Sequence, residues 1–157
     1  MAPARASRPA SAGPDVDTPL LPRRTLDAPA VGQRVAFSRT LTEADTALFV
    51  GVTWDVNPYH TDDAYASATR FGRRIVPGLL TASLLTHLGG LWAFLATEMR
   101  FELVAPVYIG ETITAEMEVV EIDPDRGRVR VRGRCVNREG QEVLRADISG
   151  FPGRFAT

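Results

Sequence analysis

Two residues that can exchange protons lie five positions apart in this sequence, in a polar segment that contains a proline. Asp55 supplies a carboxylate and His60 an imidazole, and between them Asn57 directly precedes Pro58. A proline-stiffened turn can bring such a pair to one small pocket, where the two groups hold a water, one accepting a proton and the other delivering one. The Asn57 amide can fix the turn or orient a partner. On spacing alone a structural interpretation stays open, in which Asp55 caps a turn and His60 packs against a neighbour.

Few other residues suggest chemistry. Two distant histidines and one cysteine fall short of a metal-ligand cluster, so we expect no metal site. No glycine-rich loop follows a strand, which argues against a nucleotide cofactor. A net charge of −1 and the lack of a basic stripe with aromatic residues argue against nucleic acid and anionic membranes as partners. We expect His87 to pack in a core and Cys135 to be a small buried strand residue.

The chain divides by composition into a short N-terminal tail and one domain. Residues 1–29 hold six of the eleven prolines, and their short apolar pieces are interrupted at once. They lack the continuous apolar stretch of a secretory signal, so we expect a disordered tail. Residues 30–157 have the length of one globular domain, which fits the hydrophobic fraction of 45%. The single cysteine fits a reducing compartment, and we expect a cytoplasmic protein.

A strand and a helix are expected before the polar segment. Residues 32–41 have the pattern of a short strand, and Thr42 then begins a helix with Asp45 three positions on, as in a loose capping box. The helix should end near Trp54, where the turn begins, and Thr61 can cap a short second helix. One apolar face is predicted for the first helix because apolar residues recur every fourth position: Ala44, Leu48 and Val52.

A long apolar helix is predicted from Gly78 to Thr97, with Pro77 near its first position. This stretch contains no formally charged residue, but Ser83, His87 and two adjacent glycines favour a buried helix of a soluble domain over a membrane span. After it the apolar pattern changes to a period of two, which predicts half-buried antiparallel strands. Helices followed by an antiparallel meander define an α+β domain. The predicted strands are residues 99–103, 112–119, 128–135 and 143–148.

The segment from Phe49 to Ala66, FVGVTWDVNPYHTDDAYA, resembles the signature of the MaoC-like hydratases, also called R-specific enoyl-CoA hydratases. The resemblance implies a hot-dog fold, in which an antiparallel sheet wraps a long central helix, here the helix from Gly78. Such domains pair, so one short chain implies a homodimer. The acyl pantetheine of a coenzyme A or acyl-carrier-protein thioester would enter near the subunit boundary. Matching motifs continue in the family's order, within roughly residues 32–150, at 69–71, 75–84, 101–102 and 105–114.

The resemblance also implies an activity and its residues. The reaction is the reversible hydration of a trans-2-enoyl thioester to an (R)-3-hydroxyacyl thioester, and no cofactor is implied. By the family's pattern, Asp55 and His60 bind the water and act as acid and base. The backbone N–H of Gly78 polarises the thioester carbonyl, a role that suits a helix N-terminus. Three further residues are implied to assist the site or bind substrate: Asn57, Ser83 and Thr86.

Two positions depart from the family's pattern and bear on substrate choice. Pro77 stands where the family commonly has a histidine before the glycine, which changes the pocket wall but keeps the glycine amide. Trp54 stands where the family commonly has a glycine before the aspartate, and its bulk can reshape the acyl channel. The alternate arginines from Arg128 to Arg134 are expected to form a solvated strand face, although they could also meet the phosphates of coenzyme A.

Two other functions stay open. A hot-dog thioesterase often places a carboxylate on the central helix to activate water, and residues 78–97 contain no Asp or Glu. A non-catalytic acyl-CoA-binding partner subunit would be free to lose the acid/base set, which is intact here in Asp55, Asn57 and His60. Both features favour the hydratase.

Overall fold

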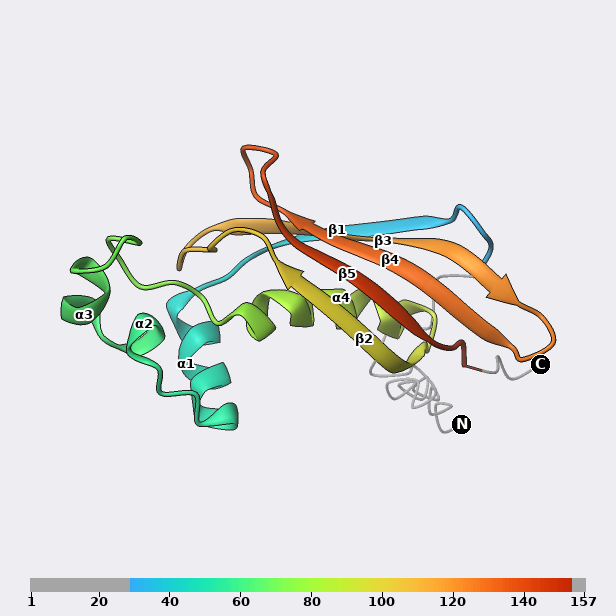
Figure 1. The fold of residues 1–157 in the computed structure, drawn as a ribbon, viewed down its shortest axis with the longest axis horizontal. Helices are drawn as coiled ribbons and strands as arrows, with labels where there is room; N and C mark the ends of the chain where they lie inside the picture. The colour runs from blue at the N-terminus through green and yellow to red at the C-terminus, as the bar shows by residue number, and fades with distance from the viewer. Residues whose placement is uncertain (1–28, 154–157) are drawn as a thin grey trace, which may run out of the picture.

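A five-stranded antiparallel sheet, with one helix lying across a face of it, makes up the body of the molecule (Figure 1). The computed structural model describes residues 29–153, so the expected tail of residues 1–29 lies outside the described residues apart from Pro29. The α+β hot-dog architecture expected from the sequence is confirmed. The strands are β1 (Arg34–Thr40), β2 (Leu95–Leu103), β3 (Thr112–Asp123), β4 (Arg128–Val136) and β5 (Glu142–Phe151). The helices are α1 (Glu43–Thr53), α2 (Pro58–Thr61), α3 (Asp63–Ser67) and α4 (Gly78–Leu91).

The strands lie in the spatial order β1-β3-β4-β5-β2, which leaves β1 and β2 at the two edges of the sheet. Each neighbouring pair is antiparallel. The predicted alternation is clearest in β3, where Ile113, Ala115, Met117 and Val119 are buried and the residues that alternate with them are partly exposed. One face of the sheet is therefore apolar and packs on α4, while the other face is polar and open to solvent.

Arginines on the polar face pair with carboxylates of other strands of the sheet. Arg128 lies 2.7 Å from Glu98, and Arg134 lies 2.7 Å from Glu116. The expectation of a solvated strand face is confirmed, because these side chains remain half-exposed and their charges are matched within the sheet. Such exposed pairs contribute little to stability.

Helix α4 packs its leucines into the concave face of the sheet. Leu84, Leu85 and Leu88 are at most 4% exposed. Gly133 of β4 permits this close approach, because a Cβ at that position would lie 2.9 Å from a methyl carbon of Leu85. The expected central helix is thus present. No helix within residues 29–153 is long and apolar enough to cross a membrane.

The end of α4 differs from the sequence-based prediction. The helix stops at Leu91 rather than Thr97, and β2 already begins at Leu95. Two adjacent glycines near the end of α4 weaken the helix. The chain then reverses through Trp92, whose side chain is 1% exposed, and Ala93, whose φ of 47° lies in the left-handed region. Burial of the indole in the core fixes this reversal and sends the chain to the sheet edge.

Helix α1 begins as predicted but packs differently. The capping box is confirmed, since Thr42 Oγ1 accepts a hydrogen bond from the Asp45 N–H at 3.2 Å and the Asp45 carboxylate accepts one from the Thr42 N–H at 2.9 Å. These hydrogen bonds lower the pKa of Asp45. The predicted apolar face, however, does not pack against the domain: Leu48 is 70% and Val52 83% exposed. The helix instead contacts the body through the side that carries the buried Thr46.

The two remaining single-residue predictions have opposite outcomes. His87 is exposed, not packed in the core, because only one side of α4 is covered by the sheet. Its ring lies beside that of Phe37 on the edge strand β1, with 4.4 Å between the ring centroids. Cys135 is fully buried, as predicted, and burial raises the pKa of its thiol to about 12.

Candidate active site

The turn between α1 and α2 carries the predicted acid/base pair. Helix α1 is capped at its C-terminus by Trp54, which takes the left-handed conformation with φ of 59°, one that favours glycine. Its side chain is 84% exposed. Helix α2 begins one turn later, where Asn57 Oδ1 accepts a hydrogen bond from the Tyr59 N–H at 3.2 Å and Pro58 occupies the first helical position. The Asn57 amide therefore fixes the turn, one of the two roles foreseen for it.

The carboxylate and the imidazole face each other across this turn. Asp55 Oδ2 lies 3.8 Å from His60 Nε2, with the His60 side chain 10% and the Asp55 side chain 44% exposed. This distance is too long for a direct hydrogen bond. On the other side of the ring, His60 Nδ1 lies 2.8 Å from the carbonyl oxygen of Ile75. Because a carbonyl can only accept, Nδ1 carries the proton of the neutral ring and the Nε2 lone pair is directed toward Asp55.

Arg74 links α2, the short helix that carries His60, to α1 and α3. Its guanidinium donates to both carboxylate oxygens of Glu43 in α1, at 2.9 and 2.8 Å, and to Asp63 in α3 at 2.7 Å. It also donates to the backbone carbonyl of His60 at 3.2 Å. The two carboxylates raise the pKa of Arg74, Glu43 having the larger effect. Sequence reasoning missed this residue, since its partners are 31 and 11 positions away and no local motif joins them.

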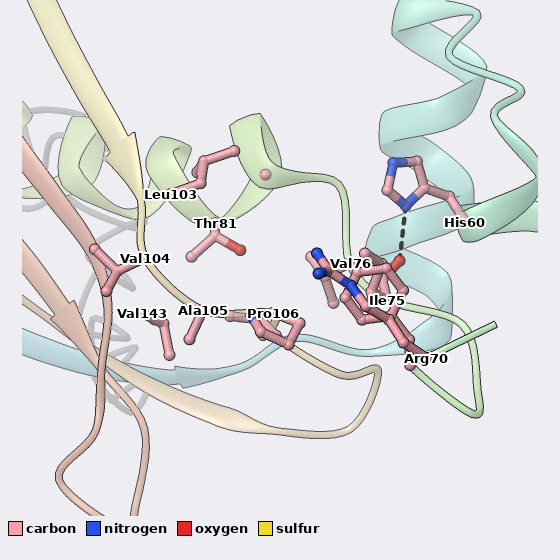
Figure 2. A pocket seen from close by; sticks show the side chains of 13 residues that line it. His60, Arg70, Ile75, Val76, Thr81, Leu103, Val104, Ala105, Pro106 and Val143 are labelled. Carbon is pink, nitrogen blue, oxygen red and sulfur yellow. Dashed lines mark hydrogen bonds between the residues drawn. The ribbon is translucent and has the colours of Figure 1, made fainter.

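A cavity of about 330 Å³ brings His60 together with the start of α4 (Figure 2). Figure 1 shows α1, α2 and α3 gathered at this end of α4. Gly78 lines the cavity beside His60, and Arg70 and Thr81 contribute polar groups. The remaining wall is mostly apolar and comes from the segment between α3 and α4, the end of β2 with the residues after it, and the start of β5. The site thus combines a base, a helix N-terminus and an apolar wall.

The first turn of α4 is open toward this cavity. Pro77 precedes the helix and makes no side-chain hydrogen bond to it. The first N–H groups of a helix have no partner within the helix, and the Pro77 carbonyl accepts from Leu80 and Thr81, so the N–H groups of Gly78 and Leu79 are left to bind a ligand oxygen. Gly78 also lets the wall come close, because a Cβ there would overlap a methyl carbon of Leu103. The N-terminus of α4 can therefore stabilise negative charge that develops beside His60.

Ser83 and Thr86 do not line the cavity that His60 and Gly78 share. Ser83 lies in a separate groove of about 270 Å³ between α4 and α1, together with Leu48 and Val52. Thr86 is exposed on the open side of α4. Both hydroxyls donate to backbone carbonyls of α4, at 2.6 Å each. Their roles toward substrate stay predictions, and both residues lie on the part of α4 that the sheet leaves uncovered.

Comparison with known proteins agrees with this fold. Residues 27–140 match the family model described as MaoC like domain. An (R)-specific enoyl-CoA hydratase of Aeromonas caviae is 37% identical over 127 residues, covering 73% of this chain and 93% of that protein. An (R)-specific enoyl-CoA hydratase of Rhodospirillum rubrum is 36% identical over 110 residues, covering 66% of this chain and 75% of that protein.

A solved structure of an R-hydratase shows the same similarity. An R-hydratase from Pseudomonas aeruginosa in the unliganded form superimposes with a TM-score of 0.73 at 28% identity, covering 82% of this chain and 88% of that one. The class defined by the fold is therefore the hot-dog domain. Within that class, this chain belongs to the MaoC-like domain family, which confirms the resemblance seen in its sequence.

Proposed function

We propose that this protein adds water reversibly to trans-2-enoyl thioesters, giving (R)-3-hydroxyacyl thioesters. The observation that carries the proposal is the position of His60, whose Nε2 lies 3.8 Å from Asp55 Oδ2 and whose residue lines the same cavity as Gly78 at the start of α4; Asp55 itself lies outside the lining of that cavity. The names of the two relatives at 36% and 37% identity, both (R)-specific enoyl-CoA hydratases, support this reaction.

In this mechanism Asp55 and His60 hold one water between them. One group of the pair takes a proton from the water while its oxygen bonds to C3 of the substrate, and the other delivers a proton to C2. The Ile75 carbonyl holds His60 in the tautomer with Nε2 available, 2.8 Å from Nδ1. A proton that passes back between the two groups restores the pair, so the net change is the addition of one water.

Negative charge develops on the thioester oxygen as water adds. We assign the Gly78 N–H as its hydrogen-bond donor, because this group opens a helix of 14 residues whose dipole favours an anion at its N-terminus. Asn57 supports the pair through the turn that it caps. We assign Ser83 and Thr86 to the acyl side of the substrate, along the uncovered side of α4.

The substrate is carried by coenzyme A or by acyl-carrier protein, which present the same acyl pantetheine group. We further propose a homodimer. Met99 and Leu103 of the edge strand β2 are 48% and 61% exposed although they stand opposite Ile148 and Leu144, whose side chains face α4. A second copy placed along β2 would cover this apolar edge.

The test is to mix the purified protein with crotonyl-CoA and with longer enoyl-CoA substrates and follow the absorbance of the enoyl-thioester band. A loss of absorbance with time is expected. Coupling the product to an (S)-specific 3-hydroxyacyl-CoA dehydrogenase should give no NADH, whereas a strong NADH signal would contradict the (R) assignment. Release of free thiol from saturated acyl-CoA, with no hydration, would favour the thioesterase instead.

Two variants test the acid/base pair. Asp55→Asn and His60→Gln should each lower turnover by about 10²–10⁴-fold while the protein stays folded, because each removes one positioned proton-transfer group. Circular dichroism and the melting temperature check the fold. Turnover close to wild type in either variant would show that the pair is not the catalytic one.

A further inference from the structure

The side chain of Thr81 is buried beside the active-site cavity, and its hydroxyl has nothing to bond to. Thr81 is 2% exposed, and its Oγ1 has no hydrogen-bond partner within residues 29–153. A buried hydroxyl gives up its hydrogen bonds to water, so leaving it unpaired destabilises the folded protein. Such a group calls for an explanation.

The other helical hydroxyls show how unusual this is. In the four described helices, every other serine and threonine donates its hydroxyl to a backbone carbonyl three or four residues earlier: Thr46, Thr53, Thr61, Ser67, Ser83 and Thr86. This arrangement is the ordinary way for a helix to satisfy such a side chain. The carbonyl of Pro77, four residues before Thr81, instead accepts only from the backbone N–H groups of Leu80 and Thr81.

The unpaired hydroxyl lies where the proposed reaction needs a donor. Thr81 lines the same cavity as His60 and Gly78 and follows Gly78 by three residues, one helical turn. Side chains on a helix lean toward its N-terminus, so Thr81 leans over the turn that Gly78 opens. In Figure 2 the Thr81 oxygen points into the cavity, away from the β5 residue Val143 and toward the side where Val76 and Arg70 lie.

The surrounding wall offers the Thr81 hydroxyl few hydrogen-bond partners. The residues that line the cavity at the end of β2, in the segment that follows it and at the start of β5 are apolar, among them Leu103, Ala105 and Val143. A ligand with an oxygen atom at this point would satisfy the hydroxyl, and the apolar wall would exclude the water that otherwise competes for it. A hydrogen bond in such surroundings is stronger than one made in water.

We propose that the Thr81 hydroxyl donates a hydrogen bond to the thioester carbonyl oxygen of the substrate, as a second donor beside the Gly78 N–H. This inference rests on the proposed hydratase function and adds a catalytic residue to it. The hydroxyl can rotate to follow the oxygen as its negative charge grows, so it acts most strongly in the transition state. The unpaired hydroxyl then lowers the stability of the free protein and forms its hydrogen bond only when substrate is bound.

The test compares Thr81→Val with Thr81→Ser and with the control Thr46→Val. Valine keeps the approximate shape of threonine and puts a methyl group in place of the hydroxyl, whereas serine keeps the hydroxyl and lacks the methyl group. Thr46 is also 2% exposed, but its hydroxyl is bonded to the carbonyl of Thr42 at 3.3 Å, outside the cavity. Each variant is measured for its melting temperature without substrate and for kcat and KM with crotonyl-CoA.

The expected signature is opposite in sign for stability and activity. Thr81→Val should raise the melting temperature by about 2–4 °C, since it removes an unpaired buried polar group. It should lower kcat by about 10- to 100-fold with little change in KM, less than the loss of a sole oxyanion donor because the Gly78 N–H remains. Thr81→Ser should recover most of kcat, and Thr46→Val should lower the melting temperature and leave kcat unchanged.

Other outcomes decide against the proposal. If Thr81→Val lowers kcat and the melting temperature together, the hydroxyl is structural. If the loss appears only in KM, the hydroxyl binds another part of the substrate. If wild type hydrates crotonyl-CoA and Thr81→Val does so equally well, this inference fails while the hydratase function stands. A wild-type protein without hydratase activity would refute both.

Discussion

The Arg74 guanidinium is the contact whose removal best separates positioning from chemistry at this site. It joins Glu43 of α1, Asp63 of α3 and the carbonyl of His60, yet it does not line the cavity. Arg74→Gln removes the charge and can keep at most part of these hydrogen bonds. We expect His60 to lose one restraint and to keep the other, its bond to the Ile75 carbonyl.

The stability loss should be moderate. The Arg74 side chain is 18% exposed, but those of Glu43 and Asp63 are 59% and 81% exposed, so solvent screens both ion pairs. Each such pair contributes about 0.2–1 kcal/mol, and the hydrogen bond to the His60 carbonyl about 1 kcal/mol. A total loss of about 1.4–3 kcal/mol corresponds to a melting temperature lower by about 3–12 °C.

The effect on rate should exceed what this stability loss can explain. A catalytic group that is held less firmly loses part of its alignment, and a loss of about 10-fold in kcat corresponds to about 1.4 kcal/mol of transition-state stabilisation. The matched control is Arg73→Gln, which removes the same charge one residue earlier. Arg73 is exposed and stacks over the ring of Tyr108 at 4.3 Å from its centroid.

Initial rates of enoyl-CoA hydration well below the melting temperature, together with thermal denaturation, decide the matter. We expect Arg74→Gln to lose rate while fully folded, and Arg73→Gln to keep it. If both variants lose the same rate, the effect is one of general charge. If Arg74→Gln keeps the wild-type kcat, the contact is structural only and does not position His60.

The remaining predictions concern the helix start, the sheet edge and the buried thiol. Gly78→Pro should abolish turnover because it removes the N–H donor. Gly78→Ala should lose less of its turnover, since the added Cβ would displace only the exposed end of Leu103. Steady-state rates that rank the two variants the other way would contradict the role of the amide. Met99→Glu should shift the protein from dimer to monomer in sedimentation velocity, because it places a charge in the apolar edge of β2. A variant that stays dimeric would show that the dimer interface does not lie along β2. Cys135, whose burial raises the pKa of its thiol to about 12, should not react with iodoacetamide at pH 8 until the protein is denatured, so modification of the native protein at the rate of a free thiol would contradict the buried position.

The features that sequence reasoning predicted well are those set by neighbouring residues. The capping box of Thr42 and Asp45, the turn that Asn57 caps and the alternation along β3 all depend on contacts within a few positions of the chain. The family signature added the hot-dog fold and the pairing of Asp55 with His60, because the order of these motifs is specific. These predictions needed no knowledge of packing.

The errors arose where distant parts of the chain decide the outcome. The exposure of Leu48 and Val52 depends on which side of α1 meets the body, and a periodic pattern cannot tell whether a face is covered by the same chain. The expectation that His87 packs in the core is wrong because only one side of α4 lies under the sheet. The early end of α4 depends on the burial of Trp92, the residue that follows the helix.

The sequence by itself therefore determined the α+β class, the local turns and the candidate acid/base pair. Only the tertiary structure decided which groups meet at the site: the Ile75 carbonyl that sets the tautomer of His60, the Arg74 guanidinium that joins three helices, and the unpaired hydroxyl of Thr81. The physical reason is the distance along the chain between the residues that interact. Caps and alternation are satisfied within one or two turns of chain, whereas these contacts exist only after α4 and the sheet have packed and brought residues up to 31 positions apart within hydrogen-bond distance.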